Sequence, residues 1–290
     1  MLFRSHQFQI RQVKPYQLSF ILLIALSSCS FGSKKEEALA EDIPAAIPSF
    51  VDYEVERLTG QKGPCELDSL SSQCLTYNVE YPKITGRVPE AVIDKIKENI
   101  KSNIFDYAFI SEKPNSFESL IDELSVAYTD ILKDMPDYSA SWSMEVNSDV
   151  LFQDSLFISV ASTIYSYTGG AHPNAYQVYR SYDLATGDPV TLSDILGVGY
   201  ENDLNSAAEI EFRMLKEIPP SQALKDKGYF FENEKFVLNE NFAIINKSLV
   251  FYFNPFEIAP YAVGPTELEL KLTDYVMLIK DSGVLSGFKN

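Results

Sequence analysis

The sequence predicts an α+β fold in which a mostly antiparallel sheet packs with about three amphipathic helices. Segments with an apolar residue at every second position are interspersed with segments whose apolar residues recur at every fourth position. Their order is one strand, two helices, several strands, one helix and several strands, which favours the α+β class. Hydrophobic residues make up 46% of the 290 residues, enough for one large domain or two small sub-domains.

The alternation of apolar and polar residues and the positions of prolines predict the first elements of the fold. Residues 75–81 alternate between apolar and polar and predict a half-buried strand, which Pro82 ends. Pro89 opens a helix whose apolar stripe runs to Ala108, while lysines and a glutamate occupy the opposite face. Ser116 is a good N-cap for a second helix, and Pro136 ends it.

The second half is predicted to be mainly sheet, because it is rich in β-branched and aromatic residues. Strands are expected at 139–146, 155–167 and 176–184, then a short helical turn at 191–196 and an amphipathic helix at about 203–217. A hairpin formed by 242–245 and 249–253 and a last alternating strand at 267–272 complete the chain.

The N-terminus has the pattern of a bacterial lipoprotein signal. Three basic residues precede the apolar run 18–26, which is too short to span a bilayer permanently. The following Leu-Ser-Ser-Cys resembles a lipobox, so we expect a signal peptide at 1–28 and a lipidated Cys29 that anchors the protein to a membrane. The alternative is an ordinary secretory signal with a chance cysteine. Ser30 favours the outer membrane, on its periplasmic face or at the cell surface, and 29–50 is expected to be a tether.

The chain is strongly acidic. Its formal net charge of −17 would become −20 once the three basic residues of the signal are removed. Nucleic acid is excluded as a partner, because phosphate binding depends on clusters of basic residues. A basic protein partner would be attracted. Ordinary solubility of an exported protein explains the same charge.

Cysteine and histidine are scarce. Cys65 and Cys74 are expected to form a disulfide in an oxidising compartment, since no further cysteine pair or histidine cluster suggests a metal site. The mature chain would keep His172 alone, and the sequence has neither a Gly-x-Ser-x-Gly elbow nor a glycine-rich phosphate loop. Glycan hydrolysis by two carboxylates stays open, because 41 acidic residues make some close pair inevitable.

Two loops stand out as candidate binding elements. Residues 165–174 combine two glycines with His172 before a proline, and tyrosines flank them. Residues 254–264 carry two prolines, a glycine and the aromatic residues Phe256 and Tyr261. Exposed aromatic residues on shaped loops suit protein recognition or sugar stacking. Packing of the same side chains against the sheet is the structural alternative.

These loops carry a family resemblance. Residues 167–174 (Tyr-Thr-Gly-Gly-Ala-His-Pro-Asn), followed by Thr-Leu-Ser-Asp-Ile-Leu at 191–196, are similar to an extracytoplasmic domain family of unknown function. The lysozyme-sensing anti-sigma factor RsiV and the accessory domain of the peptidoglycan deacetylase PdaC share it. Residues 256–264 resemble a motif in the C-terminal part of this family, with Phe256 in place of the usual tyrosine. The resemblance spans about residues 50–280 and implies an N-terminal PdaC/RsiV-like module at 51–140 and a C-terminal RsiV-like module at 141–290.

The resemblance implies a recognition function. RsiV-like domains bind lysozyme, a basic protein that would suit this acidic chain, whereas the sigma-binding segment of RsiV and the metal-binding catalytic domain of PdaC have no counterpart here. We therefore expect a lipid-anchored, non-catalytic envelope module without cofactor or metal, which binds a protein such as lysozyme or a peptidoglycan fragment. The expected ligand-binding residues are Tyr167, Thr168, Gly169, Gly170, His172, Asn174, Phe256 and Tyr261. The alternatives are a carboxylate-dependent cell-wall hydrolase and a structural subunit of an outer-membrane assembly.

Overall fold

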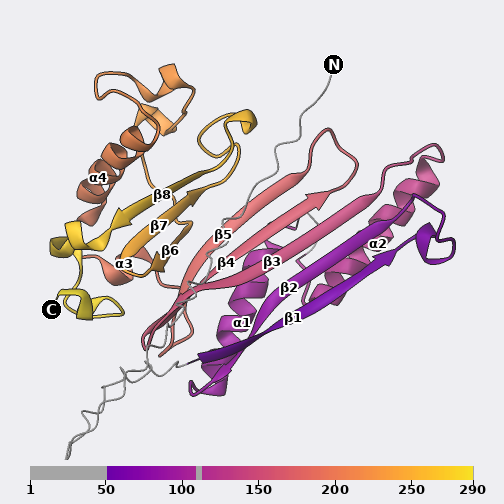
Figure 1. Ribbon diagram of the computed structural model, residues 1–290, viewed down its shortest axis with the longest axis horizontal. Coiled ribbons are helices and arrows are strands. Elements are labelled where there is room, and N and C mark those ends of the chain that lie inside the picture. Colours follow the sequence, from indigo (N-terminus) through magenta and orange to yellow (C-terminus); the bar gives the residue numbers. More distant parts are fainter. Residues whose placement is uncertain (1–50, 109–112, 290) are drawn as a thin grey trace, which may run out of the picture. The chain divides into compact units, whose positions relative to one another are not determined.

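The computed structural model describes residues 51–108 and 113–289 (Figure 1). The expected signal peptide, the lipidation site Cys29 and the tether lie outside the described residues. Among the described residues, no helix combines the length and the apolar character needed to cross a membrane.

A five-stranded mixed sheet forms the larger part of the fold. Its strands are β1 (Val51–Lys62), β2 (Leu75–Gly86), β3 (Trp142–Gln153), β4 (Phe157–Tyr167) and β5 (Asn174–Asp183). They lie side by side in chain order, and every neighbouring pair is antiparallel except β2 and β3. That parallel pair follows from the connection: two helices separate β2 from β3, and such a crossover returns the chain in the same direction.

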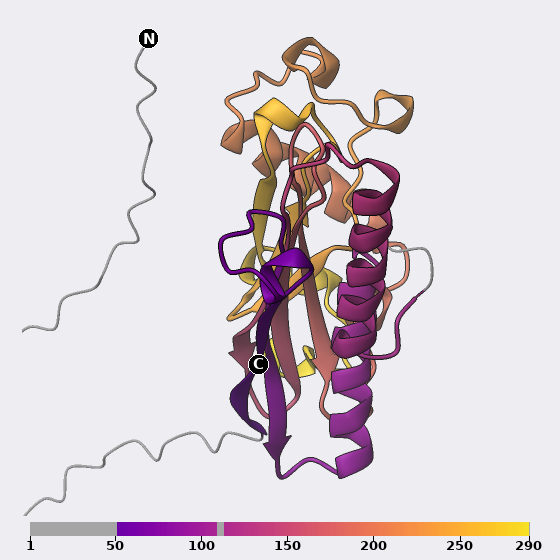
Figure 2. The same ribbon diagram turned by 90° about the vertical axis from the view of Figure 1, so that its right-hand side faces the viewer.

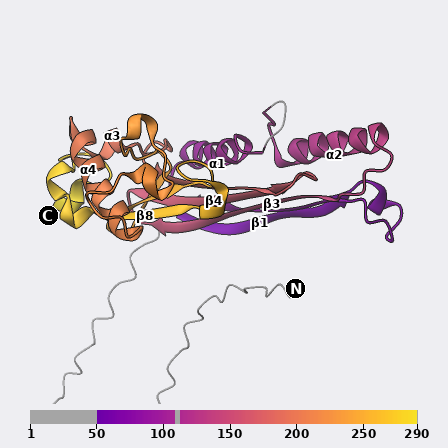
Figure 3. The same ribbon diagram turned by 90° about the horizontal axis from the view of Figure 1, so that it is seen from above.

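The two helices of this crossover cover one face of the sheet. They are α1 (Glu90–Phe105) and α2 (Phe117–Asp134), and Figures 2 and 3 show them along the same face. The residues Ile96 and Ile100 of α1 share a core with Ile158, Val160 and Ile164 of β4. Because strand side chains alternate between faces, the even-numbered residues of β4 face the helices and the odd-numbered ones face the opposite side.

A three-stranded antiparallel sheet lies on that opposite side, against β4 and β5. It consists of β6 (Phe242–Ile245), β7 (Ser248–Phe253) and β8 (Thr266–Lys271). Ala161 of β4 and Tyr179 of β5 pack with Ala243 and Val250 of this sheet. The short helix α3 (Leu192–Ile195) and the amphipathic helix α4 (Tyr200–Leu215) contribute to a second core with β6, β7 and β8.

Short 3₁₀ segments connect these elements. They lie at Pro64–Glu66, Leu224–Lys227, Glu232–Glu234, Tyr261–Val263, Leu272–Asp274, Val276–Leu278 and Ser286–Lys289. The architecture confirms the predicted α+β class and the three amphipathic helices α1, α2 and α4. The strand β1 was missing from the prediction, and α4 begins at Tyr200, three residues earlier than expected.

Serine side chains join β6 to the larger sheet. The Ser159 hydroxyl donates to the carbonyl oxygen of Ile244 at 2.6 Å, and the Ile244 N–H donates to the Ser181 hydroxyl at 2.9 Å. The two hydroxyl oxygens lie 2.7 Å apart, so the remaining proton of Ser181 is donated to Ser159. The free edge of β6 is therefore satisfied by side chains of β4 and β5 rather than by another strand.

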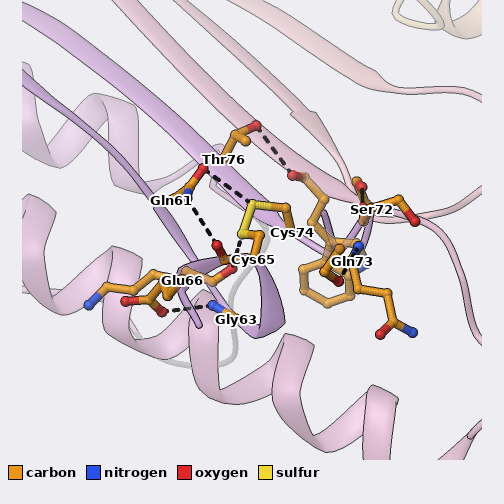
Figure 4. Close-up of a disulfide and its surroundings, with 12 residues drawn as sticks. Gln61, Gly63, Cys65, Glu66, Ser72, Gln73, Cys74 and Thr76 are labelled. Atoms are coloured by element: carbon orange, nitrogen blue, oxygen red, sulfur yellow. Dashed lines mark hydrogen bonds between the residues drawn. A yellow bond between two sulfur atoms is a disulfide. The ribbon is translucent and has the colours of Figure 1, made fainter. Parts of the chain in front are cut away.

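The predicted disulfide between Cys65 and Cys74 is confirmed (Figure 4). It closes the connection between β1 and β2, and the Cα atoms of the two cysteines are 5.4 Å apart. The Gly63 N–H donates to the Glu66 carboxylate at 2.8 Å inside the same turn. Closing a loop of this length stabilises the folded state by about 2–3 kcal/mol in the chain-entropy model.

Candidate functional site

Aromatic residues from the two candidate loops meet in space. The ring of His172, in the β4–β5 connection, stacks on the ring of Tyr261, in the β7–β8 connection, with centroids 4.9 Å apart and planes inclined by 18°. The Phe256 ring lies 5.2 Å from Tyr261 and 6.1 Å from His172. All three side chains are exposed, Phe256 to 55% and Tyr261 to 37%. We call these three residues the aromatic shelf.

Asparagine side chains hold the β7–β8 connection against β5. The Asn254 Oδ1 accepts from the Gln177 N–H at 2.7 Å, and its Nδ2 donates to the Gln177 carbonyl at 3.1 Å. The Asn241 Oδ1 accepts from the Tyr179 N–H at 2.7 Å, and its Nδ2 donates to the carbonyls of Gln177 and Tyr252, both at 2.8 Å. These amides occupy the free edge of β5 and fix where the second loop lies.

The backbone at Phe256 adopts a conformation that few residues favour. Its φ is +68°, in the left-handed region, where a non-glycine residue costs of order 1–3 kcal/mol. The neighbouring hydrogen bond from the Asn254 N–H to the Glu257 carboxylate, at 2.7 Å, closes the turn around it. The strained residue is one member of the exposed aromatic shelf.

Other predicted site residues of the β4–β5 connection have structural contacts. Gly169 has φ +84°, and a side chain there would collide with the Tyr138 hydroxyl, so glycine is required. Tyr138 also donates to the Thr168 carbonyl at 3.2 Å. The φ of the neighbouring Gly170 is not positive. Tyr167 pairs with Ser143 in the β3–β4 ladder, and Asn174 pairs with Ser166 at the start of β5.

Two clefts border the aromatic shelf. One, of about 310 Å³, is lined by Thr163, Ala175, Tyr176, Gln177, Tyr252, Pro255, Tyr261, Gly264 and Pro265. The other, of about 440 Å³, is lined by Tyr107, Tyr176, Arg180, Asn239, Glu240, Asn241, Asn254, Pro255, Phe256 and Glu257. Tyr176 and Pro255 line both clefts, so they separate the two spaces.

Several of these lining residues were not predicted. Tyr107 follows α1, and its ring lies 5.0 Å from that of Tyr176. Burial raises the pKa of Tyr107; the charge of Arg180 lowers it, and that of Glu257 raises it further. Tyr252 also has a pKa raised mainly by burial. Both phenols therefore stay protonated at neutral pH and can donate hydrogen bonds.

The site has few groups suited to catalysis. Within residues 51–108 and 113–289 no group of three His, Cys, Asp or Glu side chains could hold a metal ion. In the same residues the His172 ring has a hydrogen bond to the Pro173 carbonyl at 3.4 Å, and no bond joins it to a serine hydroxyl or a carboxylate. The arrangement offers aromatic faces, amides, phenols, one arginine and the two glutamates Glu240 and Glu257, which suits binding.

Two family models match successive parts of the chain. Residues 69–175 match the model described as deacetylase PdaC. Residues 193–273 match the model of a protein of unknown function, DUF3298. The first match covers β2 to the start of β5, and the second covers α4 and the three-stranded sheet.

Solved structures of DUF3298 proteins have the same fold. A member from Bacteroides fragilis NCTC 9343 superposes with a TM-score of 0.64 at 21% identity, covering 82% of this chain and 97% of that one. A protein from Pseudomonas aeruginosa PAO1 superposes with a TM-score of 0.57 at 19% identity, covering 79% and 95%. Among curated proteins, Esterase Rv3036c of Mycobacterium tuberculosis is 33% identical over 119 residues, which are 39% of this chain. The match spans about half of that relative, 48% of its length.

Proposed function

We propose that this chain, which belongs to the DUF3298/PdaC-like family, is a non-catalytic binding module of the cell envelope that holds a peptidoglycan fragment on the aromatic shelf. The observation that carries the proposal is the stacking of His172 on Tyr261, with Phe256 beside them, on an exposed surface between two clefts. Sugar rings have apolar faces that pack on aromatic side chains, and polar groups beside the rings then fix their orientation.

The surroundings of the aromatic shelf support binding of a polar ligand. Tyr252 and Gln177 line the smaller cleft, and the amide groups of Asn239 and Asn241 line the larger one. The side chains of Tyr252 and Gln177 can donate and accept hydrogen bonds beside the exposed rings, as recognition of a hydroxylated ring or an amide-linked peptide requires, whereas the amides of Asn239 and Asn241 are engaged within the protein and shape the larger cleft. The clefts, about 310 and 440 Å³, are within the range of small-ligand sites.

The carboxyl groups with shifted pKa values lie away from the clefts of the aromatic shelf. A glycosidase needs a carboxylic acid whose pKa is raised, so that it can donate a proton. The carboxyl groups whose pKa is shifted in the described residues are Glu80, Asp188, Asp194 and Asp281, and each is lowered, mainly by hydrogen bonds from partner side chains. None of them lines a cleft of the aromatic shelf.

Calorimetric titration of purified muropeptides tests the proposal. Replacing His172, Phe256 and Tyr261 together by alanine is expected to weaken binding about ten-fold or more, since each ten-fold is about 1.4 kcal/mol and aromatic contacts contribute about 0.5–1.5 kcal/mol each beyond buried area. The matched control is Tyr53→Ala, which removes an exposed ring of β1, 43% exposed, far along the sheet from the loops. If the triple variant binds muropeptides with unchanged affinity, the ligand does not bind on the aromatic shelf.

The membrane anchor is part of the proposal. Lipidation of Cys29 would hold the module at the outer membrane, with residues 30–50 as the tether. Cys29→Ser is expected to move the protein from the membrane pellet to the soluble fraction after cell lysis. The disulfide variant Cys65→Ser is the control, because it also removes a cysteine but leaves the anchor. Membrane partitioning that survives Cys29→Ser would overturn the anchoring.

A basic protein such as lysozyme is the second candidate ligand, favoured by the net charge of −17. Charge-steered association weakens as salt screens the opposite charges. Titration with c-type lysozyme at low and at high ionic strength therefore distinguishes the two ligands. Lysozyme binding that falls steeply with salt supports a basic protein partner. Muropeptide binding that salt hardly changes supports a peptidoglycan ligand on the aromatic shelf.

Ester hydrolysis is favoured by one observation only, the partial similarity to Esterase Rv3036c of Mycobacterium tuberculosis. His172 is the natural candidate for a base, since the sequence has two histidines and the other is His6 in the predicted signal. Turnover of p-nitrophenyl acyl esters that is lost in His172→Ala would assign an esterase activity to this chain. If the parent protein and the His172→Ala variant hydrolyse these esters at the same rate, His172 does not catalyse ester hydrolysis.

A further inference from the structure

We infer that Arg180 is the anion-recognition residue of the larger cleft and that the ligand of this module carries a carboxylate. The inference rests on the proposed function and names one chemical group of its ligand. Arg180 lies on β5, lines the cleft of about 440 Å³ and is half-buried. Phe256 of the aromatic shelf lines the same cleft, so one molecule can contact both.

The backbone holds the guanidinium of Arg180 in place. Its Nη1 donates to the carbonyl oxygen of Tyr179 at 2.7 Å and to that of Glu240 at 3.0 Å. The protons on Nε and Nη2 have no hydrogen-bond partner within residues 51–108 and 113–289. Since the guanidinium is planar, fixing one nitrogen also fixes the fork that a carboxylate would meet.

Arg180 has no carboxylate partner within the described part of the chain, although the protein is strongly acidic. Arg57 and Arg213 show the usual arrangement, because each pairs with a glutamate, at 2.9 and 2.7 Å. Half-burying a guanidinium costs desolvation free energy, which an anion bound to it would offset. A ligand carboxylate would complete it by a two-pronged, charge-assisted hydrogen bond.

The two acidic side chains of the cleft differ in how they are held. Glu257 accepts the Asn254 N–H with one oxygen, at 2.7 Å, and the Asn239 amide with the other, at 2.6 Å. Glu240 is exposed and, like Arg180, also lines a neighbouring cleft. Neither carboxylate is paired with Arg180, yet both remain near it. A singly charged carboxylate therefore fits the cleft better than a doubly charged phosphate, which these two glutamates would repel.

A tyrosine pair completes the subsite. The rings of Tyr107 and Tyr176 are 5.0 Å apart and inclined by 34°, and both line the cleft beside Arg180. The Tyr107 hydroxyl stays protonated at neutral pH because burial raises its pKa, so it can donate a second hydrogen bond to the anion. The lactyl and peptide carboxylates of peptidoglycan fragments have the required chemistry.

The test compares two ligands on each variant of the intact protein in detergent. N-acetylmuramyl dipeptide with free carboxylates is titrated beside the same molecule with its carboxylates converted to carboxamides. The parent protein is expected to prefer the acid by about ten-fold or more, as a charge-assisted hydrogen bond contributes about 1.5–3 kcal/mol. In Arg180→Gln this preference disappears, and in Arg180→Lys it is reduced, because lysine keeps the charge without the fork.

The acid-to-amide ratio is measured within one variant, so a partly unfolded fraction affects both ligands equally. The control is Arg57→Gln, which changes an arginine of β1 that is paired with Glu80 and should leave the ratio unchanged. A preference that persists in Arg180→Gln overturns the inference. Equal binding of both ligands by the parent also overturns it, while leaving the proposed function in place. Binding of neither ligand overturns both.

Discussion

Replacing Asn241 by leucine is expected to lower the free energy of unfolding by about 1–3 kcal/mol, because the buried Tyr179 N–H would be left without a partner, while the carbonyls of Gln177 and Tyr252 keep hydrogen bonds from Asn254 and Asn239. Asn241 is 9% exposed, and its side chain satisfies the N–H of Tyr179 and the carbonyls of Gln177 and Tyr252. Leucine has a similar volume but no polar atom, so all three backbone groups would lose this partner. Urea titration followed by circular dichroism measures the change.

The same substitution is expected to weaken ligand binding, since Asn241 links β5 to β7 and so positions the loop that carries Phe256 and Tyr261. Asn202→Leu is the matched control, because Asn202 is an exposed residue of α4 and its substitution should change stability by less than about 0.5 kcal/mol. An Asn241→Leu protein as stable as the Asn202→Leu protein would show that water replaces the lost hydrogen bonds.

Phe212→Ala is expected to destabilise the protein by about 3–5 kcal/mol, the usual cost of truncating a buried phenylalanine. Phe212 is fully buried on α4, and its ring lies 5.0 Å from Tyr229, 5.2 Å from Phe236 and 5.8 Å from Phe231. Removing it leaves a cavity among aromatic rings that cannot all move inward. Thermal and urea unfolding of the variant measure the loss.

Ile210→Ala on the same helix is the control for Phe212→Ala. Ile210 is 59% exposed, so its truncation removes little buried surface and should cost less than about 1 kcal/mol. If the two variants are equally stable, the core between α4 and the three-stranded sheet does not support the fold as described. Muropeptide affinity is expected to be unchanged in both variants below their unfolding temperatures, because neither residue lines a cleft of the aromatic shelf.

Local periodicity predicted the three amphipathic helices and the 242–253 hairpin well, but it missed one strand and one parallel pairing. The apolar stripe of α1 appears in the sequence at every fourth position, and Ile96, Ile100 and Ile104 are indeed buried. The strand β1 was missed even though Val51, Tyr53 and Val55 alternate with acidic residues, because an edge strand that is mostly exposed carries little hydrophobic signal. The parallel pairing of β2 with β3 depends on how the helical crossover packs, which no local pattern specifies.

The candidate site was predicted in part. His172 and Tyr261 belong to motifs about 90 residues apart, and their stacking follows from the asparagine contacts that bring the two loops together. Arg180 and Tyr107 could not be found from the sequence. A cation in the middle of a strand resembles any solvent-facing residue in the sequence. Only the structure shows that Arg180 pairs with no carboxylate of residues 51–108 and 113–289.

The junction between the two sheets has a consequence for aggregation. Exposed strand edges are templates on which another chain can add a strand. At β5 and β6 such edges face each other, and serine and asparagine side chains occupy their backbone groups. Within residues 51–108 and 113–289 no strand pairs with the outer edge of β1, and Asp52, Glu54 and Glu56 place charges along this strand. The protein thus limits self-association at three of the four edges of its two sheets, at β5 and β6 by side-chain hydrogen bonds and at β1 by charge.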